Sequence, residues 1–192
     1  MIAIVKYNAG NIKSVQNALN RLGFESILTE NQTELINADK VIFPGVGEAS
    51  SAIKYLREKG LDKVIPSLTQ PVLGICLGLQ LMCKYSEEGD TECLGIFDVN
   101  VRLFPPVDKI PHMGWHNCMT MKGNLFKGVK ASEDLYFVHR YYAEISKLTS
   151  ATCDYIVPFS AAMQKDNFYA TQFHPEKSAE TGERILKNFL EL

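Results

Sequence analysis

Through the first half of the chain, segments with the hydrophobic pattern of a strand alternate with segments that have the pattern of a helix. Residues 2–5 are uniformly apolar, and apolar side chains then recur every three or four positions from Ile12 to Leu22, where Gly23 offers a C-cap. Both patterns return after Gly23, and turn-forming residues separate the segments. Such alternation predicts a parallel sheet flanked by helices. The strands expected here are residues 2–5, 24–29, 41–43 (stopped by Pro44) and 72–75, and the helices lie around residues 12–22, 35–36 and 49–56 and from 79 onward.

The pattern changes after Tyr85, where polar loops separate strands that alternate in polarity or are rich in aromatic residues. Residues 99–103 alternate as in a half-exposed strand. Residues 160–164 and 168–173 face each other across a short polar turn, which is typical of an antiparallel hairpin. Further strands are expected at 135–139 and 141–143, and a final helix carries Ile185, Leu186, Phe189 and Leu190. We therefore expect one α/β domain over residues 1–192, with a mostly parallel central sheet and antiparallel strands in its C-terminal half.

Composition narrows the class of protein. With 192 residues, 46% of them hydrophobic, the chain is long enough to bury a full core. A net charge of -2 without runs of like charge gives no reason to expect nucleic acid or an anionic membrane as a partner. The five cysteines form no C-x-x-C pair, and Met1 leads directly into a strand rather than a signal peptide. These features predict a reducing, cytoplasmic location.

Cys76 is the best candidate for chemistry, because a buried-type strand runs into it and a helix follows without a loop. Gly74 and Gly78 flank it two residues before and after, which suits a nucleophile elbow whose reactive atom points outward. The start of the following helix would favour a thiolate. The simpler interpretation is a buried structural cysteine after a core strand, and Cys76 alone does not decide between them.

A thiol nucleophile needs a base, and His174 follows an apolar strand directly. The tripeptide His174-Pro175-Glu176 places a carboxylate two residues after the imidazole, with a proline restricting the backbone between them. This arrangement predicts a Cys-His-Glu triad in which Glu176 fixes the tautomer of His174 and stabilises its charged form. Taken alone, the tripeptide could also be a strand-end histidine beside a surface glutamate.

Attack on a carbonyl also needs hydrogen-bond donors for the oxyanion. The backbone amide of Leu77, directly after the nucleophile, would supply one. The loop Pro44-Gly45-Val46-Gly47 ends a neighbouring strand, and its glycines would let the amide of Val46 or Gly47 approach the substrate. A plain glycine turn is the alternative for this loop.

These motifs occur together, in the order and spacing of a known family. P-G-V-G at 44–47, G-I-C-L-G-L-Q at 74–80 and H-P-E-K-S at 174–178 resemble the triad-type, or class I, glutamine amidotransferases, whose fold is flavodoxin-like. Three further segments resemble one branch of that family, the glutaminase subunits of imidazole glycerol phosphate synthase. These segments are residues 9–15, 111–115 and 136–139.

The resemblance implies roles for individual residues. Cys76 would attack the side-chain amide of glutamine, His174 would pass a proton to the departing ammonia, and Glu176 would orient His174. The glutamine would be held by Gln80 and by the chain around Gly45, Arg140 and Tyr141. Arg140 stands where a small hydroxyl residue is common, so either main-chain amides or an inward-folded guanidinium would make that contact. The resemblance implies no cofactor and no metal.

The resemblance also implies a partner. A (β/α)8-barrel cyclase subunit would form a heterodimer with this chain, receive the ammonia unexposed and use it in histidine biosynthesis. Residues 111–115 (Pro111, His112, Met113, Gly114 and Trp115), Tyr136 and Lys177 would form the partner face. The alternative for residues 111–115 is a proline turn with a buried tryptophan, and for Lys177 a solvated lysine.

Two other functions fit parts of the sequence. The same glutaminase could feed ammonia to a different acceptor synthase, because the catalytic motifs do not identify the acceptor. A non-catalytic binding module could use Asn8 to Asn11 as an anion loop at a helix start. Such a module has no need of Cys76, His174 and Glu176 together, which favours the enzyme.

Overall fold

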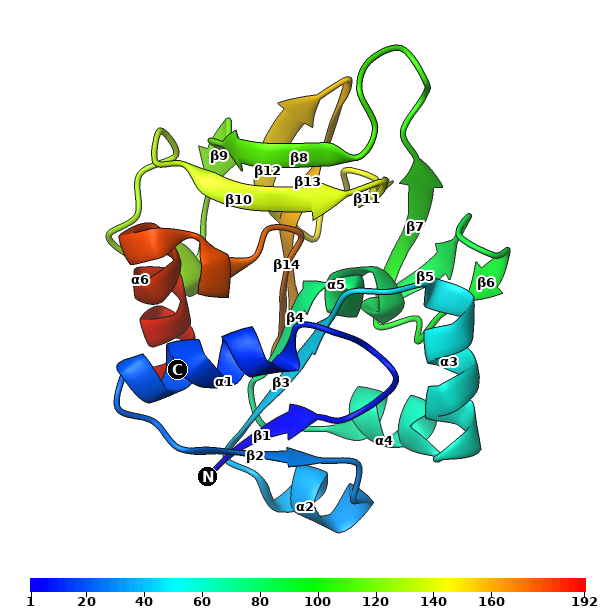
Figure 1. The fold of residues 1–192 in the computed structure, drawn as a ribbon, viewed down its shortest axis with the longest axis vertical. Coiled ribbons are helices and arrows are strands. Elements are labelled where there is room, and N and C mark those ends of the chain that lie inside the picture. The colour runs from blue at the N-terminus through cyan, green and yellow to red at the C-terminus, as the bar shows by residue number, and fades with distance from the viewer.

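The strands of the first half, with one strand from near the C-terminus, form the parallel part of an eight-stranded sheet in the computed structural model, which describes all 192 residues (Figure 1). Its strand order is β2-β1-β3-β4-β14-β13-β12-β9. The pairs from β2 to β14 run parallel, and those from β14 to β9 run antiparallel. The mixed α/β fold predicted from the sequence is thus confirmed. These strands are β1 (Ile2–Val5), β2 (Ser26–Thr29), β3 (Lys40–Gly45), β4 (Val72–Cys76), β9 (Thr120–Met121), β12 (Thr149–Tyr155), β13 (Val157–Lys165) and β14 (Phe168–Thr171).

Helices cover both faces of this sheet and divide the core into two clusters. Alternate residues of β1 point to opposite faces, so that Ala3 and Val5 join one cluster and Ile2 and Ile4 the other. The first cluster packs under α2 (Gln32–Asn37), α3 (Ala49–Glu58), α4 (Leu61–Ser67) and α5 (Leu77–Met82). The second packs under α1 (Ile12–Arg21) and α6 (Ala179–Leu190). Two short 3-10 helices are η1 (Asn124–Phe126) and η2 (Pro175–Lys177).

Two smaller sheets lie beside the main one. A two-stranded antiparallel ribbon pairs β8 (His112–His116) with β10 (Leu135–His139). A four-stranded sheet has the order β11-β7-β5-β6, and its β5–β7 pair is parallel. Its strands are β5 (Cys83–Ser86), β6 (Thr91–Glu92), β7 (Phe97–Leu103) and β11 (Tyr141–Ala143).

One local expectation is wrong, and one helix was not predicted. Pro44 does not stop β3, which continues to Gly45 with Pro44 opposite Ile75 of β4. Proline removes only a donor, and its carbonyl oxygen still accepts the Tyr7 hydroxyl at 2.7 Å. A separate helix, α4, follows α3 after the left-handed Gly60, and sequence patterning missed it because Pro66 lies within the helix.

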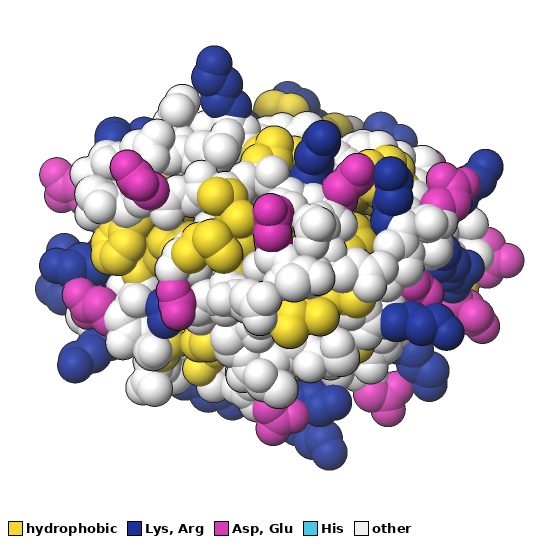
Figure 2. All heavy atoms as spheres, turned by 90° about the horizontal axis from the view of Figure 1, so that it is seen from below, with side chains coloured by type: hydrophobic (Ala, Val, Ile, Leu, Met, Phe, Trp, Pro, Cys, Tyr) yellow, Lys and Arg dark blue, Asp and Glu magenta, His cyan; other side chains and the backbone are white.

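The end of the molecule that carries β2 and α2 shows charged side chains of both signs around scattered apolar ones (Figure 2). Leu28 of β2 and Ile36 of α2 are among the exposed large apolar residues. None of the helices combines the length and apolar character that crossing a membrane requires.

Candidate active site

Cys76 ends β4, and α5 begins at the next residue, so the expected sharp turn is confirmed. Its backbone has φ 54° and ψ -105°, a conformation that a side chain disfavours. Backbone strain of this kind persists only where surrounding structure enforces it, and it concentrates at functional sites. The turn places the sulfur at the carboxyl end of the parallel strands, where loops of such sheets form sites.

The two flanking glycines make this turn possible. A Cβ atom at position 78 would lie 1.8 Å from the carbonyl oxygen of Phe43 on β3. A Cβ atom at position 74 would lie 2.8 Å from the Met82 sulfur and 3.0 Å from the backbone of Gly78. The spacing of the glycines therefore reflects close packing of α5 against β3 and β4.

His174 and Glu176 reach the same sheet edge from β14. Thr171 lies opposite Ile75 in the parallel pairing of β14 with β4, so the chain leaves β14 beside Cys76. His174 follows three residues later, and Glu176 lies in η2. The Nδ1 of His174 donates to Oε1 of Glu176 at 2.7 Å, and both side chains are buried. The hydrogen bond keeps a hydrogen on Nδ1, so Nε2 is the ring nitrogen that remains for another partner.

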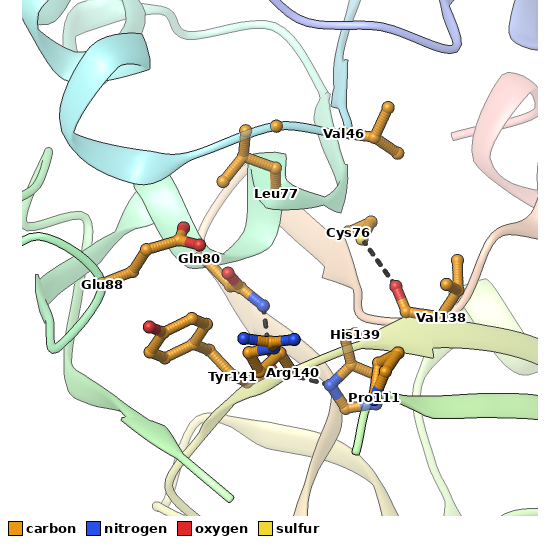
Figure 3. A pocket seen from close by; sticks show the side chains of 11 residues that line it. Val46, Cys76, Leu77, Gln80, Glu88, Pro111, Val138, His139, Arg140 and Tyr141 are labelled. Atoms are coloured by element: carbon orange, nitrogen blue, oxygen red, sulfur yellow. Dashed lines mark hydrogen bonds between the residues drawn. The ribbon is translucent and has the colours of Figure 1, made fainter.

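The environment of His174 favours its charged form. Burial lowers the pKa of His174, but the neighbouring Cys76 sulfur and then Glu176 act against burial and raise the pKa to about 10. Nε2 is buried and has no hydrogen-bond partner. The Cys76 thiol instead lies 3.9 Å from the carbonyl oxygen of Val138 (Figure 3). Nε2 of Gln172 lies 3.6 Å from the sulfur.

The main chain around His174 is held by β10. The backbone amide of His174 donates to the carbonyl oxygen of Tyr136 at 2.9 Å. The Ser178 hydroxyl accepts from the Tyr136 amide at 2.9 Å and donates to the His174 carbonyl at 2.7 Å. These three bonds fix the base relative to the β8–β10 ribbon.

A cavity of about 310 Å³ opens beside Cys76 (Figure 3). Of the residues expected to hold substrate or oxyanion, Gln80, Arg140, Tyr141, Val46, Gly47 and Leu77 line it. Gly45 does not line the cavity; it lies against the Tyr7 hydroxyl, which would be 1.9 Å from a Cβ at this position. Glu88, Pro111, Val138 and His139 complete the lining.

The P-G-V-G loop is held by the loop before α1. The Val46 carbonyl oxygen accepts the Gly10 amide at 3.0 Å. In a trans peptide the N–H and C=O point in opposite directions, so the Gly47 amide points away from Gly10. Gly47 has φ 146°, and its Cα lies within reach of the Leu77 side chain, since a Cβ there would be 3.8 Å from it.

Three polar residues of the site escaped the sequence prediction. Gln172 is buried and contacts both Cys76 and Gln80; a polar residue within the apolar run 169–173 was its only signal. The Asn11 side chain donates to Oε1 of Glu176. Glu88 lines the cavity, and burial raises the pKa of its carboxyl although the Ala49 amide donates to it at 2.8 Å. Neither Asn11 nor Glu88 carries a local signal, because only the tertiary fold brings them to the site.

Four side chains of the expected partner face lie close together, and we call them the aromatic face: Met113, Trp115, Tyr136 and Lys177. Trp115 is 52% exposed and Met113 is 58% exposed, so the alternative of a buried tryptophan is wrong. The Tyr136 ring packs edge-on against Trp115 with centroids 5.8 Å apart, and Nζ of Lys177 lies 5.9 Å from the Tyr136 centroid. Gly114 is partly buried between them in β8.

The expectation that His112 belongs to this face is contradicted, because its side chain is completely buried. Strand β8 turns alternate residues to opposite sides, so His112 points inward while Met113 points outward. Pro111 lines the cavity beside Cys76. Three histidines from β8 and β10 meet here. The ring centroid of His112 lies 4.4 Å from that of His116 and 5.0 Å from that of His139. No group of three or more His, Cys, Asp or Glu side chains is arranged to hold a metal ion.

Comparison with known proteins finds similarity to one family along nearly the whole chain. Residues 3–192 match the family described as glutamine amidotransferase class-I. The chain is 60% identical to the imidazole glycerol phosphate synthase subunit HisH of Bacteroides fragilis, with 100% of this chain and 99% of that protein covered. The corresponding subunit of Bacteroides thetaiotaomicron is 57% identical with the same coverage. A solved glutamine amidotransferase structure shares the fold, with a TM-score of 0.78 at 20% identity, over 100% of this chain and 98% of that chain.

Proposed function

The chain belongs to the class-I glutamine amidotransferases, and from this premise we propose that Cys76, His174 and Glu176 release ammonia from glutamine for a synthase partner. Its function is that of the HisH relatives: it is the glutaminase subunit of imidazole glycerol phosphate synthase, in histidine biosynthesis. The observation that carries the catalytic assignment is the buried His174–Glu176 pair beside Cys76 at the ends of β14 and β4.

The first step forms a glutamyl thioester. The Cys76 thiolate attacks the side-chain carbonyl carbon of glutamine, and the carbonyl π electrons move to oxygen as the C–S bond forms. Charged His174 then donates its Nε2 proton to the amide nitrogen, the C–N bond breaks, and ammonia leaves. Glu176 holds Nδ1–H throughout and stabilises the imidazolium, as the 2.7 Å bond allows.

The second step is hydrolysis. Neutral His174 takes a proton from water, the hydroxide attacks the thioester carbon, and the C–S bond breaks to give glutamate and the Cys76 thiolate. The amide of Leu77 and that of Val46 or Gly47 would stabilise the oxyanion in both steps, each for about 3 kcal/mol. Because the Val46 carbonyl is held by Gly10, a rearrangement of this loop would change which amide faces the cavity.

The α-ammonium and α-carboxylate of glutamine require groups of opposite charge. Glu88 and Arg140 both line the cavity, and we propose that Glu88 binds the ammonium and the Arg140 guanidinium the carboxylate. Glu88, Gln80 and Tyr141 group at one side of the cavity and Cys76 with Val138 at the other (Figure 3). Glutamine spanning this cavity would place its side-chain amide at the sulfur. Gly45, which does not line the cavity, would act only by letting the loop pack against Tyr7.

The partner we propose is a (β/α)8-barrel cyclase subunit that docks on the aromatic face. Trp115 and Met113 are exposed and Tyr136 is half-buried, and tryptophan, tyrosine and methionine side chains are enriched in interfaces. The Tyr136 carbonyl oxygen accepts the His174 amide, and Lys177 follows His174 by three residues, so this face adjoins the triad. We propose that ammonia formed at Cys76 passes to the partner here without reaching solvent. We also propose that residues 1–192 act as one domain in the cytoplasm, where the five free cysteines would stay reduced.

The test is co-purification with the barrel-type cyclase of the same organism, followed by a glutamine turnover assay. We expect weak glutaminase activity from the isolated chain and much higher activity when the cyclase binds its phosphoribulosyl nucleotide, because coupling between two sites is a shared free energy. A turnover rate that neither partner nor nucleotide changes would refute the coupling. Activation by a different acceptor synthase instead would identify another recipient of the ammonia.

A further inference from the structure

A chain of hydrogen bonds connects two buried histidines to the cavity. Nδ1 of His139 lies 2.7 Å from the carbonyl oxygen of Tyr141, and Nδ1 of His112 lies 2.9 Å from Nε2 of His139. We call His112 and His139 the histidine pair. The same Tyr141 carbonyl accepts Nε2 of Gln80 at 3.0 Å. Figure 3 shows both His139 and Gln80 directed at this stretch of backbone.

Only one assignment of protons fits this geometry if both rings are neutral. A carbonyl oxygen can only accept, so Nδ1 of His139 carries hydrogen and its Nε2 is an acceptor. Nδ1 of His112 must then donate to it, which leaves Nε2 of His112 as an unprotonated acceptor. That atom is buried and has no partner. A proton added to the pair would leave a buried N–H without an acceptor, at a cost typical of an unsatisfied donor.

The surroundings keep the pair neutral. The His112 ring stacks on Tyr155 with centroids 4.1 Å apart and on Phe137 at 5.0 Å, and Phe104 and Phe159 approach His139 within 5.3 Å. Burial lowers the pKa of His112 and of His139 to about 3. The imidazole of His139 therefore donates to Tyr141 without change across the physiological pH range.

Two hydrogen bonds, one of them to the Tyr141 carbonyl, fix the orientation of the Gln80 side-chain amide. Nε2 of Gln80 donates to Tyr141 O and, at 3.0 Å, to Oε1 of Gln172. Both of its hydrogens are then used, and its carbonyl oxygen is left as the group available to a ligand. Gln172 in turn lies 3.6 Å from the Cys76 sulfur. The orientation of Gln80 relative to the nucleophile thus depends on where the Tyr141 carbonyl is held.

We propose that His139, supported by His112, is a positioning residue for glutamine: it holds the Tyr141 carbonyl so that Gln80 presents its oxygen to the substrate. The proposal deepens the function proposed above and rests on it. His139 touches the Tyr141 backbone and acts through it, while Cys76, His174 and Glu176 carry the reaction. Loss of its hydrogen bond should weaken glutamine binding.

Three variants separate positioning from packing. His139→Leu removes the donor, whereas His139→Asn keeps an N–H close to the place of Nδ1. His116→Gln is the matched control, because His116 lies against His112 but makes no hydrogen bond through its ring. In each protein, Cys76 is alkylated with iodoacetamide at increasing glutamine concentrations, and the modified peptide is quantified by mass spectrometry.

We expect His139→Leu to raise the glutamine concentration that half-protects Cys76 on the order of tenfold, the effect of one lost hydrogen bond of about 1.4 kcal/mol. His139→Asn should return this value to within about threefold of the unsubstituted protein, and His116→Gln should change neither this value nor the alkylation rate without glutamine. Equal protection in His139→Leu and the unsubstituted protein would overturn the positioning role. Equal weakening in His139→Leu and His139→Asn would show that the ring acts by packing alone.

Two further results keep the tests independent. If glutamine does not protect Cys76 even in the unsubstituted protein bound to its cyclase, the proposed function fails rather than the role of His139. If the variants do not fold, imidazole ¹⁵N spectra of the unsubstituted protein decide the matter. They should show His139 neutral and protonated at Nδ1 down to pH 5.5, and a charged ring or the other tautomer would overturn the proposal.

Discussion

The Asn11 side-chain amide donates to Oε1 of Glu176, the same oxygen that accepts Nδ1–H of His174. Asn11 stands at the start of α1 in a left-handed conformation, with φ 69°. A residue from the first loop therefore binds a carboxylate that lies near the C-terminal end of the chain. Oε2 of Glu176 is buried without a partner, so Asn11 and His174 together determine the orientation of this carboxylate.

Removal of the Asn11 amide should impair turnover more than binding. Asn11→Gly is the informative change, because glycine keeps the left-handed backbone that most side chains disfavour. A hydrogen bond to a charged group contributes about 1.5–3 kcal/mol, so kcat should fall on the order of tenfold to a hundredfold with KM for glutamine little changed. Asn8→Gly, in the same loop but without contact to the triad, is the control. An unchanged kcat would remove Asn11 from the site.

The pKa of His174 should respond to both of its neighbours. Cys76 is the largest influence that raises it and Glu176 the next. By NMR titration, Cys76→Ala should therefore lower the pKa of His174 further than Glu176→Gln does, both from about 10. The reverse order would mean that the carboxylate, and not the sulfur, keeps the imidazole charged.

The same shift predicts how stability depends on pH. The pKa of His174 is raised above the ordinary histidine value of about 6.5, so its contribution to folding is full below that pH and is lost as pH rises toward 10. Urea unfolding should thus show the largest gap between the unsubstituted protein and Glu176→Gln near pH 6, and a smaller gap near pH 10. A gap that widens with pH would contradict the sign of the shift.

Two substitutions at the Cys76 turn should change the stability of the fold, one through backbone strain and one through packing. Glycine accepts φ 54°, so Cys76→Gly should be more stable than Cys76→Ala by about 1 kcal/mol. Gly78→Ala would push a methyl group into the Phe43 carbonyl and should cost about 3 kcal/mol or more. Thermal unfolding measures both. Gly95→Ala, where a Cβ meets no atom but φ is 68°, controls for backbone strain without a clash.

The aromatic face should carry the affinity for the cyclase subunit. Trp115→Ala removes an exposed anchor and should weaken binding by about 2 kcal/mol, on the order of thirtyfold. Ile36→Ala is the matched control, because Ile36 is 54% exposed on α2, at the other end of the main sheet. Titration calorimetry compares the two. Equal affinity of both variants would place the partner elsewhere.

Local patterns made Cys76, His174 and Glu176 candidates, because an elbow needs nearby glycines and a two-residue spacing joins base and carboxylate, and the structure brings the three to one edge of the sheet. They failed where tertiary packing decides. His112 was assigned to an exposed face with its whole segment, whereas a strand turns alternate residues to opposite sides. Asn11 and Glu88 reach the site from distant segments and carry no local signal, and Gln172 was marked only as a polar residue within an apolar run. The first-half strands were predictable because buried parallel strands are continuous apolar runs.

Covalent labelling of Cys76 with a glutamine-like chloroketone tests the central claim most directly. The claim predicts one adduct per chain, on Cys76 and none of the other four cysteines, that glutamine suppresses and His174→Ala slows strongly. An intact-mass measurement followed by peptide mapping gives the answer for the chain alone and with its cyclase. No adduct in the presence of the partner, or an adduct on Cys83, Cys93, Cys118 or Cys153 instead, would contradict the claim.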